Sequence, residues 1–85
     1  MLYTNPNDYD RPTDSGRIQK AIIEAKRSGC NQVIIPRMNE ATGKSVWIID
    51  ETILLPSDIT IIFDNCHLRM ADGVMCQMFR NENAL

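Results

Sequence analysis

Two adjacent carboxylates, Asp50 and Glu51, are the most obvious pair of candidate catalytic residues in this chain. Hydrolysis of a glycosidic bond requires two carboxyl groups on opposite sides of the bond, one of them kept protonated by its surroundings. Adjacent side chains of a strand point to opposite faces, so this pair converges only if the backbone turns between its members. We interpret Asp50 and Glu51 as turn or edge residues and predict no catalytic residue here.

A looser acidic group, Asp8, Asp10 and Asp14, lies near the N-terminus. Carboxylate oxygens bind Ca²⁺ and Mg²⁺, but a short polar side chain before a helix also accepts hydrogen bonds from the free amides at its start. We expect Asp14 to cap a helix and the other two residues to occupy solvated turns. No metal ligand is predicted among them.

Cys66, His67 and Cys76 offer three zinc ligands, but a Cys-x-x-Cys motif and a fourth ligand at ordinary spacing are lacking. Strand alternation places Cys66 inward with Leu68 and His67 outward, so the thiol and the imidazole face opposite ways. We expect a packed thiol beside a surface histidine. With Cys30 the cysteines number three, so they cannot all pair within one chain, and reduced thiols are expected.

The segment Gly43-Lys44-Ser45 matches the end of a phosphate-binding loop. Such a loop needs a second glycine five positions before the first, and Met38 occupies that place. The segment also leads into a predicted strand, so no helix dipole would face a phosphate. No phosphate-binding loop and no cofactor are predicted.

The strand around Trp47 is apolar on both faces, because Trp47 alternates with Ile49 while Val46 and Ile48 take the other face. Burial in the core or in an interface is favoured for Trp47, and a platform for stacking a sugar ring stays open as the alternative. Later apolar residues are interpreted as flexible core filler: Met70, Met75, Met78 and Phe79.

The elements that would position these residues begin with an irregular polar lead-in, residues 1–12, whose segment Asn5-Pro6-Asn7-Asp8 is typical of a turn. A helix is predicted over residues 15–28. Thr13-Asp14-Ser15 offers oxygens to the free amides at its start, and Gly29 can adopt the left-handed conformation that ends it. Its apolar residues recur at helical spacing on one face: Ile18, Ala21, Ile22 and Ala25.

After Gly29 the pattern changes to β structure, and no second helix is predicted. The expected strands cover residues 33–35, 46–49, 53–55 and 59–63. Beyond the last of these the apolar alternation changes phase at Asp64-Asn65, which requires a corner because a slip of one residue would turn every side chain to the wrong face. Asp72-Gly73 favours either a hairpin turn or a further corner.

One short sequence recurs: Val33-Ile34-Ile35-Pro36 is followed by Ile53-Leu54-Leu55-Pro56 at an offset of twenty residues. This offset is typical of one coil of a solenoid. It favours a coiled, parallel arrangement of the strands.

The order of these elements resembles the N-terminus of right-handed parallel β-helix proteins of the pectin-lyase-like kind, which include polygalacturonase-type glycoside hydrolases and phage tailspike depolymerases. The resemblance spans residues 10–79 and rests on the helix, on Val33-Ile34-Ile35-Pro36 and on Leu54-Leu55-Pro56-Ser57-Asp58-Ile59-Thr60. It implies a truncated, mostly β domain over residues 13–85, in which an N-terminal helix caps the first coils. Catalytic carboxylates of the family lie on later coils, so no catalytic, cofactor-binding or metal residue is carried over.

The resemblance implies an N-terminal capping segment of a carbohydrate-active β-helix protein, without a complete active site of its own and with a polysaccharide as partner of the parent protein. The alternatives are a non-catalytic polysaccharide-binding or structural segment, as in a tailspike, and a small self-associating β module. Open strand edges favour association, so a homo-oligomer is expected.

Composition narrows the classes of function. The chain has 85 residues, 44% hydrophobic and 24% charged, which is typical of one small globular domain. A net charge of -2 gives no strong field for nucleic acid or an anionic membrane, so neither is predicted as a partner. Residues 1–11 contain no apolar stretch of the signal-peptide kind, and no apolar run is long enough to cross a membrane. The cellular location is left open.

Overall fold

The computed structural model describes residues 2–71, 73 and 79–81. Within this part, one α-helix precedes six short strands that pair in parallel, so the prediction of a mostly β chain with one N-terminal helix is confirmed. In chain order the elements are η1 (Pro6–Asp8), α1 (Asp14–Ser28), β1 (Gln32–Ile35), β2 (Val46–Ile49), β3 (Ile53–Leu55), β4 (Thr60–Phe63), β5 (His67–Met70) and β6 (Phe79–Asn81).

The lead-in is more regular than predicted. Its turn is the 3₁₀ helix η1, which Asn5 caps by accepting a hydrogen bond from the Asn7 amide at 2.9 Å. Before η1, Thr4 forms a parallel bridge with Val33 of β1. The turn predicted at Asn5-Pro6-Asn7-Asp8 is thus present as η1, whereas the Thr4–Val33 bridge, which joins residues far apart in the sequence, was not predicted.

Helix α1 matches its predicted range to within one residue. Thr13 is its N-cap, with the hydroxyl accepting a hydrogen bond from the Gly16 amide at 3.0 Å. Gly29 ends it in the left-handed conformation at φ +80, and its N–H donates to Lys26 O at 3.3 Å. The prediction that Asp14 caps the helix was wrong, since Asp14 is the first helical residue and its carboxylate reaches β2 instead.

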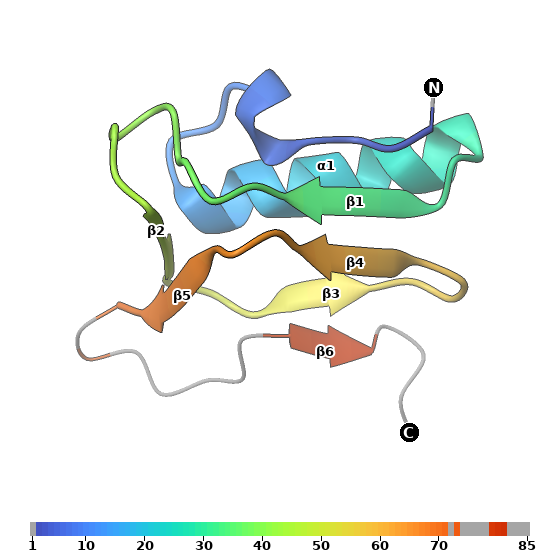
Figure 1. Cartoon of the computed structure of the whole chain (residues 1–85). Coiled ribbons are helices and arrows are strands. Elements are labelled where there is room, and N and C mark those ends of the chain that lie inside the picture. The colour runs from blue at the N-terminus through green and yellow to red at the C-terminus, as the bar shows by residue number, and fades with distance from the viewer. Residues whose placement is uncertain (1, 72, 74–78, 82–85) are drawn as a thin grey trace.

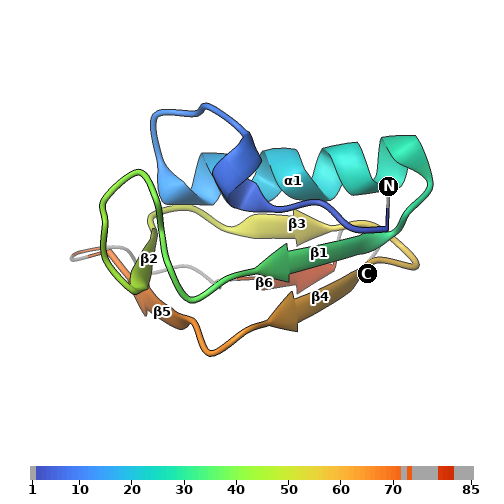
Figure 2. The same cartoon turned by 45° about the horizontal axis from the view of Figure 1, so that its top comes forward.

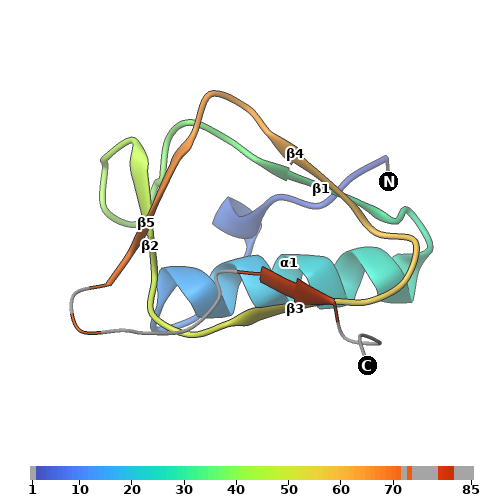
Figure 3. The ribbon, with the colours of Figure 1, turned by 90° about the horizontal axis from the view of Figure 1, so that it is seen from below.

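The strands follow one another in two passages, β1-β2-β3 and then β4-β5-β6, and each strand of the second passage pairs in parallel with its counterpart in the first. Figure 3 shows the three pairs as three sides of a triangle, with α1 running along the side on which β3 lies. Figure 1 shows α1 on the first-passage side, away from β4, β5 and β6. In Figure 2, β1 and β3 lie close to the helix, whereas β4 and β6 lie farther from it.

The twenty-residue recurrence does not mark the repeat of this structure. It relates β1 to β3, which lie on different sides of the triangle, whereas β1 pairs with β4 and β3 pairs with β6. That interpretation was wrong because the connections have unequal lengths. Residues 36–45 join β1 to β2, but only residues 64–66 join β4 to β5.

The predicted corner at Asp64-Asn65 is confirmed. Asn65 has φ +55 between β4 and β5, and among the described residues the other non-glycine positions with positive φ are Asn31 before β1 and Asp58 before β4. Asn and Asp enter this region more readily than other residues that carry a side chain. Each of these positions therefore redirects the chain just before it enters a strand.

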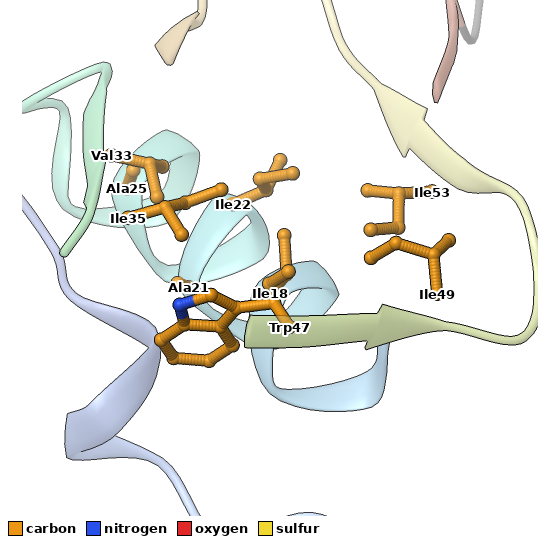
Figure 4. Close-up of a cluster of buried hydrophobic side chains, with 9 residues drawn as sticks. All are labelled: Ile18, Ala21, Ile22, Ala25, Val33, Ile35, Trp47, Ile49 and Ile53. Atoms are coloured by element: carbon orange, nitrogen blue, oxygen red, sulfur yellow. The ribbon is translucent and has the colours of Figure 1, made fainter. Parts of the chain in front are cut away.

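The core lies between α1 and the first passage of strands (Figure 4). Its nine buried apolar residues are the predicted helix stripe, Ile18, Ala21, Ile22 and Ala25, together with Val33, Ile35, Trp47, Ile49 and Ile53. Burial of Trp47 is confirmed, and its indole N–H donates to Pro36 O at 2.9 Å. A fully buried ring offers no face to a sugar, so the stacking-platform alternative for Trp47 was wrong.

Candidate functional site

The adjacent pair Asp50 and Glu51 lies in the short connection between β2 and β3, and both residues are exposed. The Asp50 amide donates to the Ser15 hydroxyl at 2.9 Å. This position in an exposed connection agrees with their interpretation as turn or edge residues. Its link to the helix also shows that the backbone here, and not the carboxylates, makes the long-range contact.

Helix α1 places polar side chains against the edge of β2 that does not pair with β5. The carboxylate of Asp14 accepts a hydrogen bond from the Ile48 amide at 2.7 Å, and the hydroxyl of Ser15 accepts the one from Asp50. Amides of alternate residues in a strand point to the same side, where a neighbouring strand would ordinarily accept their hydrogen bonds. Side chains of the helix therefore take the place of a neighbouring strand for β2.

Gln19 does the same for β3 with both ends of its amide group. Its Nε2 donates to Leu54 O at 3.0 Å, and its Oε1 accepts from Leu54 N at 2.8 Å. This pair of bonds reproduces the donor and acceptor pattern that a strand residue would offer. Two turns further along α1, Lys26 Nζ donates to Ser57 O at 3.0 Å, just beyond β3.

The edge of β1 is met by backbone groups. Thr4 N donates to Gln32 O at 2.9 Å, and Ile34 N donates to Thr4 O at 3.0 Å. We call the edges of β1, β2 and β3 that face the lead-in and α1 the capped edge. At this edge, each strand forms hydrogen bonds with the lead-in or with side chains of α1.

A buried ionic network anchors the N-terminal end of α1. Arg17 is 7% exposed, its Nη2 donates to Asp14 and to Asn39 Oδ1, and its guanidinium lies 5.5 Å from the centre of the Trp47 ring. A buried charge is tolerated when it is paired and hydrogen-bonded. Here Asp14 serves both Arg17 and the β2 edge, so the network and the capped edge share a residue.

Asn39 carries this network into the long connection between β1 and β2. It is fully buried, its Nδ2 donates to Val46 O at 3.3 Å, and its N–H donates to Lys44 O at 2.8 Å. The sequence analysis missed Arg17, Gln19 and Asn39. No local pattern marks these residues, because a polar side chain on a helix or in a turn has the spacing of a solvated residue until its distant partner is known.

The remaining acidic candidates are exposed, as expected for solvated turns. Asp8 and Asp10 border a cavity of about 360 Å³ whose other lining residues are Asn7, Tyr9, Arg17, Glu40 and Ala41. Arg17 supplies the one positive charge of this wall and is already held by Asp14 and Asn39. The cavity brings three carboxylate residues, Asp8, Asp10 and Glu40, into one wall beside this arginine.

Cys66 and His67 face opposite ways, as predicted. Cys66 packs against the core and His67 is exposed, while Cys76 lies outside the described residues. Partial burial raises the pKa of the Cys66 thiol, whereas hydrogen bonds from the Gln32 backbone and then the Ser28 hydroxyl lower the pKa of Cys30. Over residues 2–71, 73 and 79–81, no group of three His, Cys, Asp or Glu side chains is placed to hold a metal ion.

The later sites singled out in the sequence are only partly described. Met70 and Phe79 pack against the core, in line with their interpretation as filler. Met75, Met78 and Asp72 lie outside the described residues, so the choice between a hairpin and a corner at Asp72-Gly73 stays open. Gly43 lies in a turn at φ +71, and strand β2 follows it, not a helix.

No protein-family model, curated protein or solved structure matches this chain. In the part of the chain that the structure describes, no helix has the length and apolarity needed to cross a membrane.

Proposed function

We propose that this chain is the N-terminal capping segment of a carbohydrate-active right-handed parallel β-helix protein, and that it carries no complete active site of its own. The observation that carries the proposal is a difference between two edges. The capped edge of β1, β2 and β3 is occupied by the lead-in and by side chains of α1. Among the described residues, no further strand pairs with the outer edge of β4, β5 or β6.

This difference is what the terminal coil of a solenoid requires. The free edge of a strand presents unpaired N–H and C=O groups that attract other strands, so a terminal coil needs a cover on one side and a template on the other. Gln19 and Asp14 satisfy edge groups with side chains, which cannot themselves extend a sheet. Growth by further coils is thereby directed to the β4-β5-β6 side.

The carbohydrate part of the proposal is supported by the order of motifs, which resembles the start of polygalacturonase-type glycoside hydrolases. A non-catalytic segment of a polysaccharide-binding or structural β-helix, as in a tailspike, is the alternative. The two differ in whether later coils carry converging carboxylates, because hydrolysis of a glycosidic bond needs a pair of them.

Reading the coding region downstream of Leu85 tests the proposal. We expect further short strands at coil spacing, and converging carboxylates on those coils support the enzyme. The longer protein, expressed whole, should then release reducing ends from a polysaccharide. Later coils without such a pair favour the binding or structural role, whereas a stop codon directly after Leu85 contradicts the capping proposal.

The third reading, a self-associating β module, is favoured by one observation. Ile62 and Phe63 of β4 are 41% and 50% exposed beside the strand edge that has no partner in the described residues. Exposed apolar strands at a free edge pair with other copies. Light scattering at micromolar concentration should then show a homo-oligomer that Ile62→Lys weakens, while a well-folded monomer counts against self-association.

A further inference from the structure

We propose that the outer face of the β2-β5 pair binds the phosphate group of a small phosphorylated ligand. This face carries a groove of about 450 Å³, within the size of roughly 300–1,000 Å³ that small-molecule sites have. Its walls are formed by Thr42, Lys44, Val46, Ile48, His67 and Arg69. The inference does not rest on the proposed capping function, and its failure would leave that function untouched.

Strand register gathers these side chains on one face. Val46 pairs with His67 and Ile48 pairs with Arg69 in the parallel ladder of β2 and β5. Trp47 and Ile49 point into the core, so their neighbours in the strand point outward. The result is an apolar floor from β2 beside basic side chains from β5.

The groove collects positive charge in a chain that is negative as a whole. Lys44 and Arg69 are cations, and none of the six lining residues is acidic, although the net charge of the chain is -2. Within the described part of the chain, the side chains of Lys44, His67 and Arg69 make no ion pair or hydrogen bond. Their donors are therefore available to a ligand.

The end of the groove is held in place by the buried network. The buried residue Asn39 donates from its backbone to Lys44 O at 2.8 Å, and its own carbonyl accepts from Gly43 N at 2.8 Å. The Thr42 hydroxyl accepts from Lys44 N at 3.3 Å, and Gly43 turns the chain at φ +71. The backbone that carries Thr42 and Lys44 is thus positioned before any ligand arrives, which lowers the entropy cost of binding.

A phosphate monoester fits this set of groups better than a carboxylate. It carries about 1.5 to 2 negative charges at neutral pH and three terminal oxygens, which match two permanent cations and the further ring donor of His67. A carboxylate carries one charge. Recognition here uses side chains on a sheet face, so it does not depend on the backbone amides of a glycine-rich loop.

Titration of the full chain with inorganic phosphate, followed by two-dimensional ¹H–¹⁵N NMR, tests the proposal. At constant ionic strength set with chloride, we expect saturable shifts confined to residues 42–48 and 67–69. The double variant Lys44→Gln/Arg69→Gln should weaken binding about fivefold to tenfold, as expected for two exposed charge contacts. Arg37→Gln removes an exposed charge outside the groove wall and should change the affinity less than twofold, by roughly the screened long-range effect alone.

Three outcomes would overturn the assignment. The first is an absence of saturable shifts, or shifts centred elsewhere. The second is an equal loss of affinity in Arg37→Gln and in the double variant, which would indicate general attraction of anions. The third is equal affinity for acetate, which would assign the groove to carboxylates. Dispersed NMR spectra of each variant verify that the chain is folded, and the single variant Arg69→Gln repeats the test if the double variant is not.

Discussion

The two passages of strands place similar side chains at the same inward positions but bury them to different extents. Ile35 is fully buried, whereas Phe63, its partner in the β1-β4 register, is 50% exposed. The other stacked pairs show the same trend, with the first member buried and the second only partly so: Val33 and Ile61, Trp47 and Leu68, Ile49 and Met70, Ile53 and Phe79.

The cause of this difference is the cover and not the sequence pattern. Both layers point apolar residues to the inside, but α1 closes only the side of the first layer. Phe63 and Phe79 contact each other edge to face, with ring centres 5.9 Å apart, so the second layer packs within itself although its far side is open among the described residues. How deeply an inward side chain is buried therefore depends on whether its strand belongs to the first or the second passage.

The sharpest test of this comparison truncates two stacked partners. Ile49→Ala should destabilise the chain by about 3 kcal/mol, because removal of a fully buried aliphatic side chain leaves a cavity. Met70→Ala, directly across the β2-β5 ladder, should cost about 1 kcal/mol, because that side chain is only partly buried. Urea denaturation of both variants measures the two losses. Equal losses would show that the two layers are equally closed in solution.

A second test removes the residue shared by the buried network and the capped edge. Asp14→Ala leaves the buried Arg17 guanidinium without its carboxylate and Ile48 N without its acceptor, which should cost about 3 kcal/mol. The matched variant Asp10→Ala removes an exposed carboxylate and should stay within about 0.5 kcal/mol of the parent chain. Thermal or urea unfolding decides. A small effect of Asp14→Ala would mean that water replaces this carboxylate at little cost.

A third test addresses the capped edge at β3 alone. Gln19→Met keeps a side chain of similar length but removes both bonds to Leu54, at a cost of about 1 kcal/mol for partly exposed hydrogen bonds. The Leu54 amide should then exchange faster with deuterium. Lys20→Met, on the same helix, should leave exchange at Leu54 unchanged, because Lys20 contacts Glu24 and not β3. If the Leu54 amide exchanged at the same rate in Gln19→Met, the Gln19 side chain would not be acting in place of a neighbouring strand.

The smallest expected effect concerns two thiols. In a Cys76→Ser background near pH 8, Cys30 should react with Ellman's reagent faster than Cys66, because only the thiolate reacts. Hydrogen bonds from the Gln32 backbone and the Ser28 hydroxyl lower the pKa of Cys30, and burial raises that of Cys66. The Cys30→Ser and Cys66→Ser variants assign the two rates. Similar rates would show that the second layer does not shield Cys66.

Local signals were sufficient for the helix and for the change of strand phase. The cap at Thr13, the apolar stripe and Gly29 act within a few residues, and the structure confirms the predicted helix to within one residue. The change of inward positions between Phe63 and Cys66 likewise required a corner, which lies at Asn65. Such features depend only on neighbours in the chain, so the sequence reveals them.

Pairing and polar contacts were harder to predict, because their partners lie far along the chain. Val33-Ile34-Ile35-Pro36 recurs at β3, yet β1 pairs with β4, since loop lengths set the register. Asp14 looked like a cap on local grounds, but Thr13 takes that role and leaves the Asp14 carboxylate free to reach β2, 34 residues away. Neither outcome can be read from residue spacing.

By itself, the sequence determined the helix, the positions of β1 to β4, the inward alternation and the corner at Asn65, because backbone preference and apolar periodicity act over short distances. The tertiary structure decided which strands pair, which passage of strands has fully buried side chains, and which polar residues of α1 serve as partners for β2 and β3. Those outcomes depend on hydrogen bonds and packing between distant segments, and the helix side chains acquire their role only when the strand edges lie beneath them.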